Sequence, residues 1–543
     1  MRCALRLFIV GCCLFVSGII VYGQSGPRLS GMVLDEMGVP ISPAIVRVQT
    51  TQHTTHTDSM GRFSLDVPAD GEYTLTAWAQ GYFNADPVTA YARDDGITLI
   101  LRKHLDEDVP GYQWISAFSI EGNHLNCENC HSSDDQFTTS LPFDEWVNDV
   151  HANSLKNPRF LTMYTGTDVN GNQSPLTQYT FNRDYGQTPL PPNLEQPYYG
   201  AGYLLDFPNS TGNCATCHAP QLAVNTPFEA DPRHAEGVAN EGITCDFCHK
   251  IWDVNLNPTT QLPYPNMTGT LAYEYRRPDG EVQFFAGPYD DVQGDDTYVQ
   301  LQTESAFCAG CHHAEFWGVV IYDSYGEWLT SPYNHPETGQ TCQDCHMPAG
   351  KSAYIAHRAV GGLERDPQTI FSHDMTLSAE LLAKTATLTI QTEQQAGELI
   401  VTATVINSGA GHHIPTDSPL RQIFLVIEAT DSDGNPLALL DGTILPDWAG
   451  DLAGQPGRYY AKLLEQLWTG VFPSGSYWMP VIIREDTRIP ALGEDVSVYR
   501  FASPDGVDVT ITAKLILRRA FSDITIQKGW DFPDVILAQA QNN

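Results

Sequence analysis

The segment Cys245-Asp-Phe-Cys-His249 is one of five Cys-x-x-Cys-His motifs in this chain of 543 residues. The other four motifs begin at Cys127, Cys214, Cys308 and Cys342. Two thiols separated by two residues reach the two vinyl groups of one porphyrin, and the imidazole that follows lies beneath the iron as its proximal ligand. The sequence therefore predicts five covalently bound c-type haems, each carrying one iron.

The motifs contain every predicted attachment and proximal residue. The predicted thioether cysteines are Cys127, Cys130, Cys214, Cys217, Cys245, Cys248, Cys308, Cys311, Cys342 and Cys345. The predicted proximal iron ligands are His131, His218, His249, His312 and His346. Paired Cys-x-x-Cys units also build zinc ribbons. Only 17 of the 543 residues are histidine, yet histidine follows all five second cysteines, and this disfavours zinc.

The N-terminal residues have the pattern of an export signal. Cys3, Cys12 and Cys13 are the cysteines outside the motifs, so none is left for a disulfide beyond this segment. Two arginines precede an apolar run over residues 7–22, which predicts a secretory signal peptide over residues 1–23. An uncleaved membrane anchor is the alternative, because the run approaches the shortest length that spans a bilayer.

The chain is too long for one ordinary core, and its composition separates three regions. Residues 27–104 alternate short apolar and polar runs with frequent turn residues, which predicts a small antiparallel β-sandwich. Residues 105–382 contain every haem motif and lack long amphipathic periodicity, so we expect an irregular core of short helices and loops held by porphyrins. Residues 383–543 return to β-like runs and predict a second all-β sandwich.

The N-terminal region resembles the carboxypeptidase regulatory-like domain. The segments that carry the resemblance are 31–40, 57–63 and 71–82, with their glycine, aspartate and aromatic positions. This resemblance implies a prealbumin-like sandwich of seven strands with no catalytic role of its own.

Three other segments support a second resemblance: Cys245-Asp-Phe-Cys-His-Lys250, Thr341-Cys-Gln-Asp-Cys-His-Met-Pro348 and Gly411-His-His-Ile-Pro-Thr416. With the five motifs, they resemble multihaem c-type cytochromes whose haem core is similar to the tetrahaem nitrification cytochrome. The usual activity of that family is electron transfer, but related haem cores occur in hydroxylamine oxidoreductase and pentahaem nitrite reductase. The sequence contains no Cys-x-x-Cys-Lys motif, so the lysine-ligated haem of many nitrite reductases has no counterpart.

The distal ligands decide between carrier and enzyme. A haem with histidine on both faces is coordinatively saturated and carries electrons, whereas an open sixth site binds substrate. The match of Gly-His-x-Ile-Pro-Thr to the family pattern favours His412 as a distal ligand supplied by the C-terminal sandwich. The further predicted distal ligands are, in order, His151, His357, His373 and His124. His234, His313 and His335 are reserves, and His413 is interpreted as a neighbour.

The spacing of the motifs suggests which haems are neighbours. The first cysteines are separated by 87, 31, 63 and 34 residues. The motifs at Cys214 and Cys245, and those at Cys308 and Cys342, are therefore two closer pairs, and we expect each pair to hold neighbouring porphyrins.

The charge of the chain limits its partners. The 29 basic and 65 acidic residues give a net charge of −36, which excludes nucleic acid as a natural partner and disfavours anionic lipid. An acidic face would steer a basic redox protein in a salt-sensitive way. The same charge also serves solubility.

These patterns predict an exported pentahaem cytochrome that is periplasmic, on the cell surface or extracellular, and that carries electrons between redox proteins, other cytochromes among them. Two alternatives stay open. One is an oxidoreductase acting on a small nitrogen or sulfur compound at one open haem. The other is a self-assembling or surface-anchored haem array for extracellular electron transfer. Membrane contact is expected only if the N-terminus is retained or lipidated, and no catalytic residue is assigned.

Overall fold

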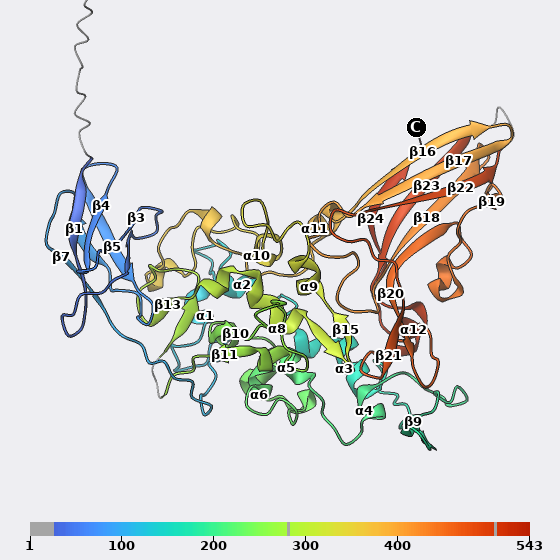
Figure 1. Cartoon of the computed structure of the whole chain (residues 1–543), viewed down its shortest axis with the longest axis horizontal. Coiled ribbons are helices and arrows are strands. Elements are labelled where there is room, and N and C mark those ends of the chain that lie inside the picture. Colours follow the sequence, from blue (N-terminus) through green and yellow to red (C-terminus); the bar gives the residue numbers. More distant parts are fainter. Residues whose placement is uncertain (1–25, 280–282, 504–507, 543) are drawn as a thin grey trace, which may run out of the picture.

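The computed structural model describes residues 26–279, 283–503 and 508–542, and the signal peptide predicted over residues 1–23 lies outside them. The N-terminal strands stand at one end of an elongated molecule, the large C-terminal sheets at the other, and the short helices between them (Figure 1). Within the described ranges, no helix is long and apolar enough to cross a membrane.

The N-terminal region contains two small sheets, as its alternating sequence predicted. One sheet has the order β4-β1-β7 and the other β3-β2-β5-β6. The strands are β1 (Arg28–Asp35), β2 (Ile45–Val48), β3 (Thr54–His56), β4 (Arg62–Asp66), β5 (Glu72–Trp78), β6 (Val88–Tyr91) and β7 (Ile97–Leu101). Inward residues such as Val46, Leu75 and Leu99 are fully buried between the sheets, where each apolar side chain contributes about 1.5–3 kcal/mol. The predicted N-terminal β-sandwich is confirmed.

The middle of the chain forms short helices and two-stranded ribbons. The helices are α1 (Glu128–His131), α2 (Pro142–Trp146), α3 (Pro158–Thr165), α4 (Tyr203–Asp206), α5 (Ala215–His218), α6 (Pro220–Ala223), α7 (Cys245–Cys248), α8 (Ala309–His312), α9 (Ser324–Leu329) and α10 (Cys342–His346). The ribbons pair β8 (Tyr179–Asn182) with β9 (Gly186–Pro189), β10 (Ile251–Val254) with β11 (Tyr273–Tyr275), β12 (Phe285–Gly287) with β13 (Asp296–Tyr298), and β14 (Ala314–Phe316) with β15 (Val319–Tyr322).

The C-terminal region is built from two larger sheets. One has the order β16-β17-β22-β19 and the other β21-β20-β18-β23-β24. The elements are α11 (Ala379–Lys384), β16 (Thr387–Gln395), β17 (Glu398–Ile406), β18 (Gln422–Asp431), β19 (Leu439–Asp441), β20 (Gly457–Gln466), β21 (Val481–Asp486), β22 (Glu494–Ala502), β23 (Val509–Arg518), α12 (Ser522–Lys528) and β24 (Val535–Gln541). Alternate residues of β17 point into the core, whereas the central strand β18 is buried on both faces. The chain as a whole is therefore mixed and mostly non-helical, with β-rich ends.

The N-terminal sandwich is attached to the middle region by the loop before β13. Arg47 makes a bidentate ion pair with Asp290, with distances of 2.6 and 2.9 Å. The buried Asp291 accepts hydrogen bonds from the backbone N–H of Thr50 at 2.7 Å and from Arg365 at 2.8 and 3.1 Å. Because these charges are buried and fully paired, the contact is specific and costly to break.

Replacing Asp291 by asparagine should weaken this attachment strongly. The change leaves the Arg365 guanidinium, whose side chain is 6% exposed, without its counter-charge, and loss of one partner of a buried pair costs about 3–5 kcal/mol. Denaturant unfolding measures the loss. The control Asp70→Asn removes an exposed pair with Arg93 and should cost less than about 1 kcal/mol. Equal effects of the two variants would contradict the prediction.

Candidate haem-binding cavity

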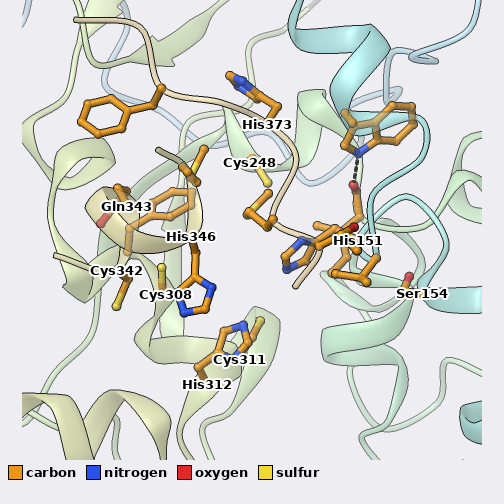
Figure 2. Close-up of a pocket in the computed structure, with 18 of the residues that line it drawn as sticks. His151, Ser154, Cys248, Cys308, Cys311, His312, Cys342, Gln343, His346 and His373 are labelled. Atoms are coloured by element: carbon orange, nitrogen blue, oxygen red, sulfur yellow. Dashed lines mark hydrogen bonds between the residues drawn. The ribbon is translucent and has the colours of Figure 1, made fainter. Parts of the chain in front are cut away.

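All five motifs open onto one cavity. Its volume is about 1260 Å³, and its walls include every motif cysteine and every motif histidine. The ten cysteines are free thiols. Figure 2 shows part of this cavity, with motif residues from α7, α8 and α10 gathered around it and the ring of His151 directed toward them. The cavity therefore brings together the residue types that covalent porphyrin attachment needs.

Each motif lies on a single helical turn. The second cysteine and the histidine follow the first cysteine by three and four residues, so all three side chains share one face of the turn. Local capping supports two of the turns: the Thr244 hydroxyl accepts from the Phe247 N–H ahead of α7, and Thr341 and Asp344 form a capping box at α10. The local sequence thus presents two thiols and one imidazole to the same side.

Three of the five motif histidines are oriented as metal ligands are. The Nδ1 atom of His131 lies 2.5 Å from the carbonyl of Ile355, and that of His249 lies 2.7 Å from the carbonyl of Ala286. The Nδ1 atom of His312 lies 3.2 Å from the Asp417 carboxylate. A hydrogen bond from Nδ1–H fixes the tautomer and leaves Nε2 for the metal. These residues fit an iron carried by an attached porphyrin.

Two of the predicted distal histidines lie opposite motif histidines. The ring centres of His412 and His346 are 6.3 Å apart, and those of His151 and His312 are 6.5 Å apart. Two imidazoles that share a metal about 2.0 Å from each nitrogen have ring centres roughly 6 Å apart. Both separations therefore suit a metal held between the rings.

Hydrogen bonds also orient these two distal candidates. The Nδ1 atom of His412 lies 2.9 Å from the carbonyl of His413, and that of His151 lies 2.8 Å from the buried Asp149 carboxylate. Burial raises the pKa of Asp149, but the hydrogen bond with His151, the charge of His151 and backbone hydrogen bonds together outweigh it, so the net pKa is lowered. Sequence reasoning did not single out Asp149, although its position two residues before His151 was a usable signal.

The other three distal candidates differ in placement. His373 lines the cavity, and removal of its ring from water first, and then the charges of His249 and His131, lower its pKa to about 4. His124 lines the cavity from an exposed position. His357 lies outside the cavity lining, because its Nδ1 accepts the Ala359 N–H at 3.0 Å and caps a turn. The backbone N–H of His357 donates to the carbonyl of Cys130 at 2.7 Å, so His357 lies beside the first motif, and its role as a distal ligand stays a prediction.

His218 has surroundings unlike those of the other motif histidines. Its ring stacks on Phe160 with centres 3.7 Å apart, and burial alone lowers its pKa to about 4. His346 and His312 each face another histidine, and His131 and His249 both influence His373. In the described part of the chain, no second histidine contacts the ring of His218 or influences its pKa.

The thiols show which motifs are neighbours. Cys127 interacts directly with Cys245, Cys217 with Cys311, and Cys308 with Cys342. The pairing expected for the motifs at Cys308 and Cys342 is present, whereas the motif at Cys245 lies against that at Cys127 instead of that at Cys214. Chain folding between distant segments, and not sequence spacing, sets these contacts.

Glu327 on α9 connects the cavity wall to the C-terminal sheets. Its buried carboxylate pairs with Arg488, accepts from the Thr416 hydroxyl at 2.6 Å and lies 3.1 Å from His413. Burial raises the pKa of Glu327, but the hydrogen bond with His413 and the charge of Arg488 outweigh it and lower that pKa to about 2.

The low pKa of Glu327 predicts an acid-sensitive contact. Because the folded-state pKa lies below the ordinary value of 4.5, this stabilisation is complete above about pH 4.5 and is lost as the pH falls towards 2. Glu327→Gln should cost about 1–3 kcal/mol at pH 7, because it removes the charge that holds Thr416 and Arg488 while Arg488 keeps its ion pair with Asp486, and the variant should lose less stability in acid. Unfolding free energies measured from pH 7 to pH 2 test both points. Glu398→Gln, at the more exposed pair with Arg500, is the control.

Comparisons with known proteins agree with this architecture. The family model of the carboxypeptidase regulatory-like domain matches residues 28–99, which confirms the predicted N-terminal resemblance. Among solved structures, the chain is similar to a penta-heme cytochrome c552 from Thermochromatium tepidum, with a TM-score of 0.51 and 18% identity over 77% of this chain and 97% of that one. At this identity the likeness concerns the fold.

A second solved structure overlaps only a small part of the chain. It is a type II cohesin–X-dockerin complex from Acetivibrio cellulolyticus, with a TM-score of 0.13 and 18% identity over 21% of this chain and 81% of that one. The search of curated proteins gave no match. Among the described residues, no group of three or more histidine, cysteine, aspartate or glutamate side chains is arranged to hold a metal ion.

Proposed function

We propose that this protein is an exported c-type cytochrome in which five haems carry electrons between redox partners. The observation that carries the proposal is the gathering of ten thiols and five motif histidines on one cavity, with His412 and His151 each opposite a motif histidine. The fold likeness to a penta-heme cytochrome c552 supports the same function. The proposed domains are the N-terminal sandwich over 27–104, the haem core over 105–382 and the C-terminal sandwich over 383–543.

The residues divide into attachment, ligand and orienting groups. The ten motif cysteines would form the thioethers, and His346 with His412 and His312 with His151 would ligate two of the irons. Haem supplies reversible one-electron exchange at iron, and ligation by two histidines gives lower potentials than ligation by histidine and methionine. Asp149 and Asp417 hold their histidines in the ligating tautomer.

The proposed setting is outside the cytoplasm, in the periplasm, on the cell surface or in the medium. The net charge of −36 suits an encounter with a basic redox protein, such as another cytochrome. An encounter of this kind should weaken as ionic strength rises, because surface charges are screened beyond roughly 10 Å at 0.1 M salt.

Haem quantification and low-temperature electron paramagnetic resonance on one oxidised sample test this function. We expect five haems per chain, with most of the irons low-spin and six-coordinate. Fewer than five haems per chain would contradict the cofactor assignment. A protein with all its haems that passes no electrons to or from any cytochrome partner would contradict the carrier role.

The surroundings of His218 favour a second candidate function. No second histidine faces its ring in the described part of the chain, and Tyr322 and Tyr477 line the cavity close to the Cys214 thiol. A haem at this motif would leave a coordination position for a small nitrogen or sulfur compound. One high-spin haem per chain that responds to added nitrite, hydroxylamine or sulfite would support this oxidoreductase, and a fully low-spin protein would exclude it.

A further inference from the structure

Three arginines meet where the cavity reaches the C-terminal sheet. Arg159 lies on α3, next to the Phe160 ring that stacks on His218. Arg421 precedes β18 and Arg519 follows β23, and the register Gln422↔Arg518 places these two positions at the same end of paired strands. All three residues line the cavity. The cluster therefore joins two regions of the chain beside the motif that begins at Cys214.

Neighbouring carboxylates balance the positive charge of this cluster only in part. In the described part of the chain, Arg159, Arg421 and Arg519 form no ion pair, whereas arginines such as Arg365 and Arg488 do. Arg421 donates to the Thr416 carbonyl at 3.1 Å and lies near Asp417, but that carboxylate is engaged by His312.

Arg159 is the least satisfied member of the cluster. Its Nε atom is buried and has no hydrogen-bond partner, and its guanidinium lies 4.7 Å from the centre of the Phe532 ring. Burial first, and then the charges of Arg421 and Arg519, lower the pKa of Arg159 to about 10. An unpaired donor beside two like charges is costly unless an anion completes the site.

We propose that Arg159, Arg421 and Arg519 form a binding site for an oxyanion beside the Cys214–His218 motif. Guanidinium groups match oxyanions that carry two oxygens on one atom, because the parallel N–H donors reach both oxygens at once. Two sources share this chemistry: a free small oxyanion of the nitrite or sulfite class, and the propionate carboxylates of an attached porphyrin. Binding of a free oxyanion depends on the open-haem function proposed for the motif at His218. Binding of a propionate depends only on the proposed haem attachment.

Anion titration of the haem-loaded full-length protein tests the site. Sodium nitrite and sodium sulfite are added separately to the wild type and to the double variant Arg159→Gln/Arg519→Gln, and the optical and paramagnetic resonance spectra are followed. If the free anion is the occupant, it perturbs the wild-type spectra and its dissociation constant rises at least about tenfold in the double variant. Arg62→Gln, an exposed arginine on β4, is the charge-matched control and should leave the dissociation constant unchanged.

A redox titration of the same samples distinguishes the second source. If propionates occupy the site, the wild type shows no response to nitrite or sulfite, and removal of two positive charges lowers the midpoint potential of one haem relative to wild type and Arg62→Gln. Fully haem-loaded variants with neither a binding change nor a potential change would overturn the oxyanion site. A wild-type protein with fewer than five haems would instead contradict the proposed function. Arg159→Lys keeps the positive charge but removes the planar pair of N–H donors. It therefore checks that any effect follows from the guanidinium geometry.

Discussion

Replacing Cys245 and Cys248 together by serine is expected to reduce the haem content from five per chain to four or fewer and to destabilise the middle of the molecule. Both thiols line the cavity, and Cys245 also interacts directly with Cys127 of another motif. Deleting one large buried side chain costs about 3–5 kcal/mol, and one face of a porphyrin has a larger apolar area than any side chain. A loss of about 4 kcal/mol lowers the melting temperature by roughly 10 °C in a domain of 150–250 residues.

Haem staining, pyridine haemochrome quantification and thermal unfolding measure this effect. The single variant Cys245→Ser is the matched comparison, because it keeps one thioether and His249 and should retain more haem than the double variant. Five haems and an unchanged melting temperature in the double variant would contradict covalent attachment at this motif.

The second large effect is expected for His412→Ala, which should convert one low-spin haem into a high-spin one. His412 lies opposite His346 at a separation that suits a shared metal, whereas the other two histidines that influence His346, His312 and His151, face each other. Loss of the sixth ligand leaves the iron five-coordinate or water-bound and raises its midpoint potential, because a strong donor to the oxidised iron is removed.

The adjacent histidine provides the control for this experiment. His413 is bound to the Glu327 carboxylate, so His413→Ala should reduce stability but leave the spin states as in the wild type. Electron paramagnetic resonance on both variants separates the two roles. Five low-spin signals in His412→Ala, or a high-spin haem in His413→Ala, would show that the ligand is assigned to the wrong residue.

The β-sandwich at the N-terminus was predictable because its signal is local. Strand β4 buries Phe63 and Leu65 and exposes the residues on either side of them. Such alternation of apolar and polar residues predicts which face of a strand points into the core. The same alternation is present in β17 at the other end of the chain. In the middle region the apolar cavity lining is spread over segments without a common period, so sequence predicted only short helices there.

The distal candidates show how little the local sequence says about the role of a histidine. His412 and His151, which match the family pattern, lie opposite motif histidines, and their role as ligands stays a prediction. His357, predicted after them, lies beside the Cys130 carbonyl and caps a turn outside the cavity lining. Histidine is equally suited to ligating, capping and surface roles, and the residues next to it in sequence do not decide among them.

The five Cys-x-x-Cys-His motifs were readable from the sequence alone, because two thiols and one imidazole at this spacing share one face of a single helical turn. Only the tertiary structure decided which motifs are neighbours, which histidines oppose them and where Arg159, Arg421 and Arg519 meet. The physical reason is the sequence distance over which each contact is made. Spacing of three and four residues fixes geometry within one turn, whereas a distal ligand or an arginine cluster is assembled from segments hundreds of residues apart by the packing of the whole chain.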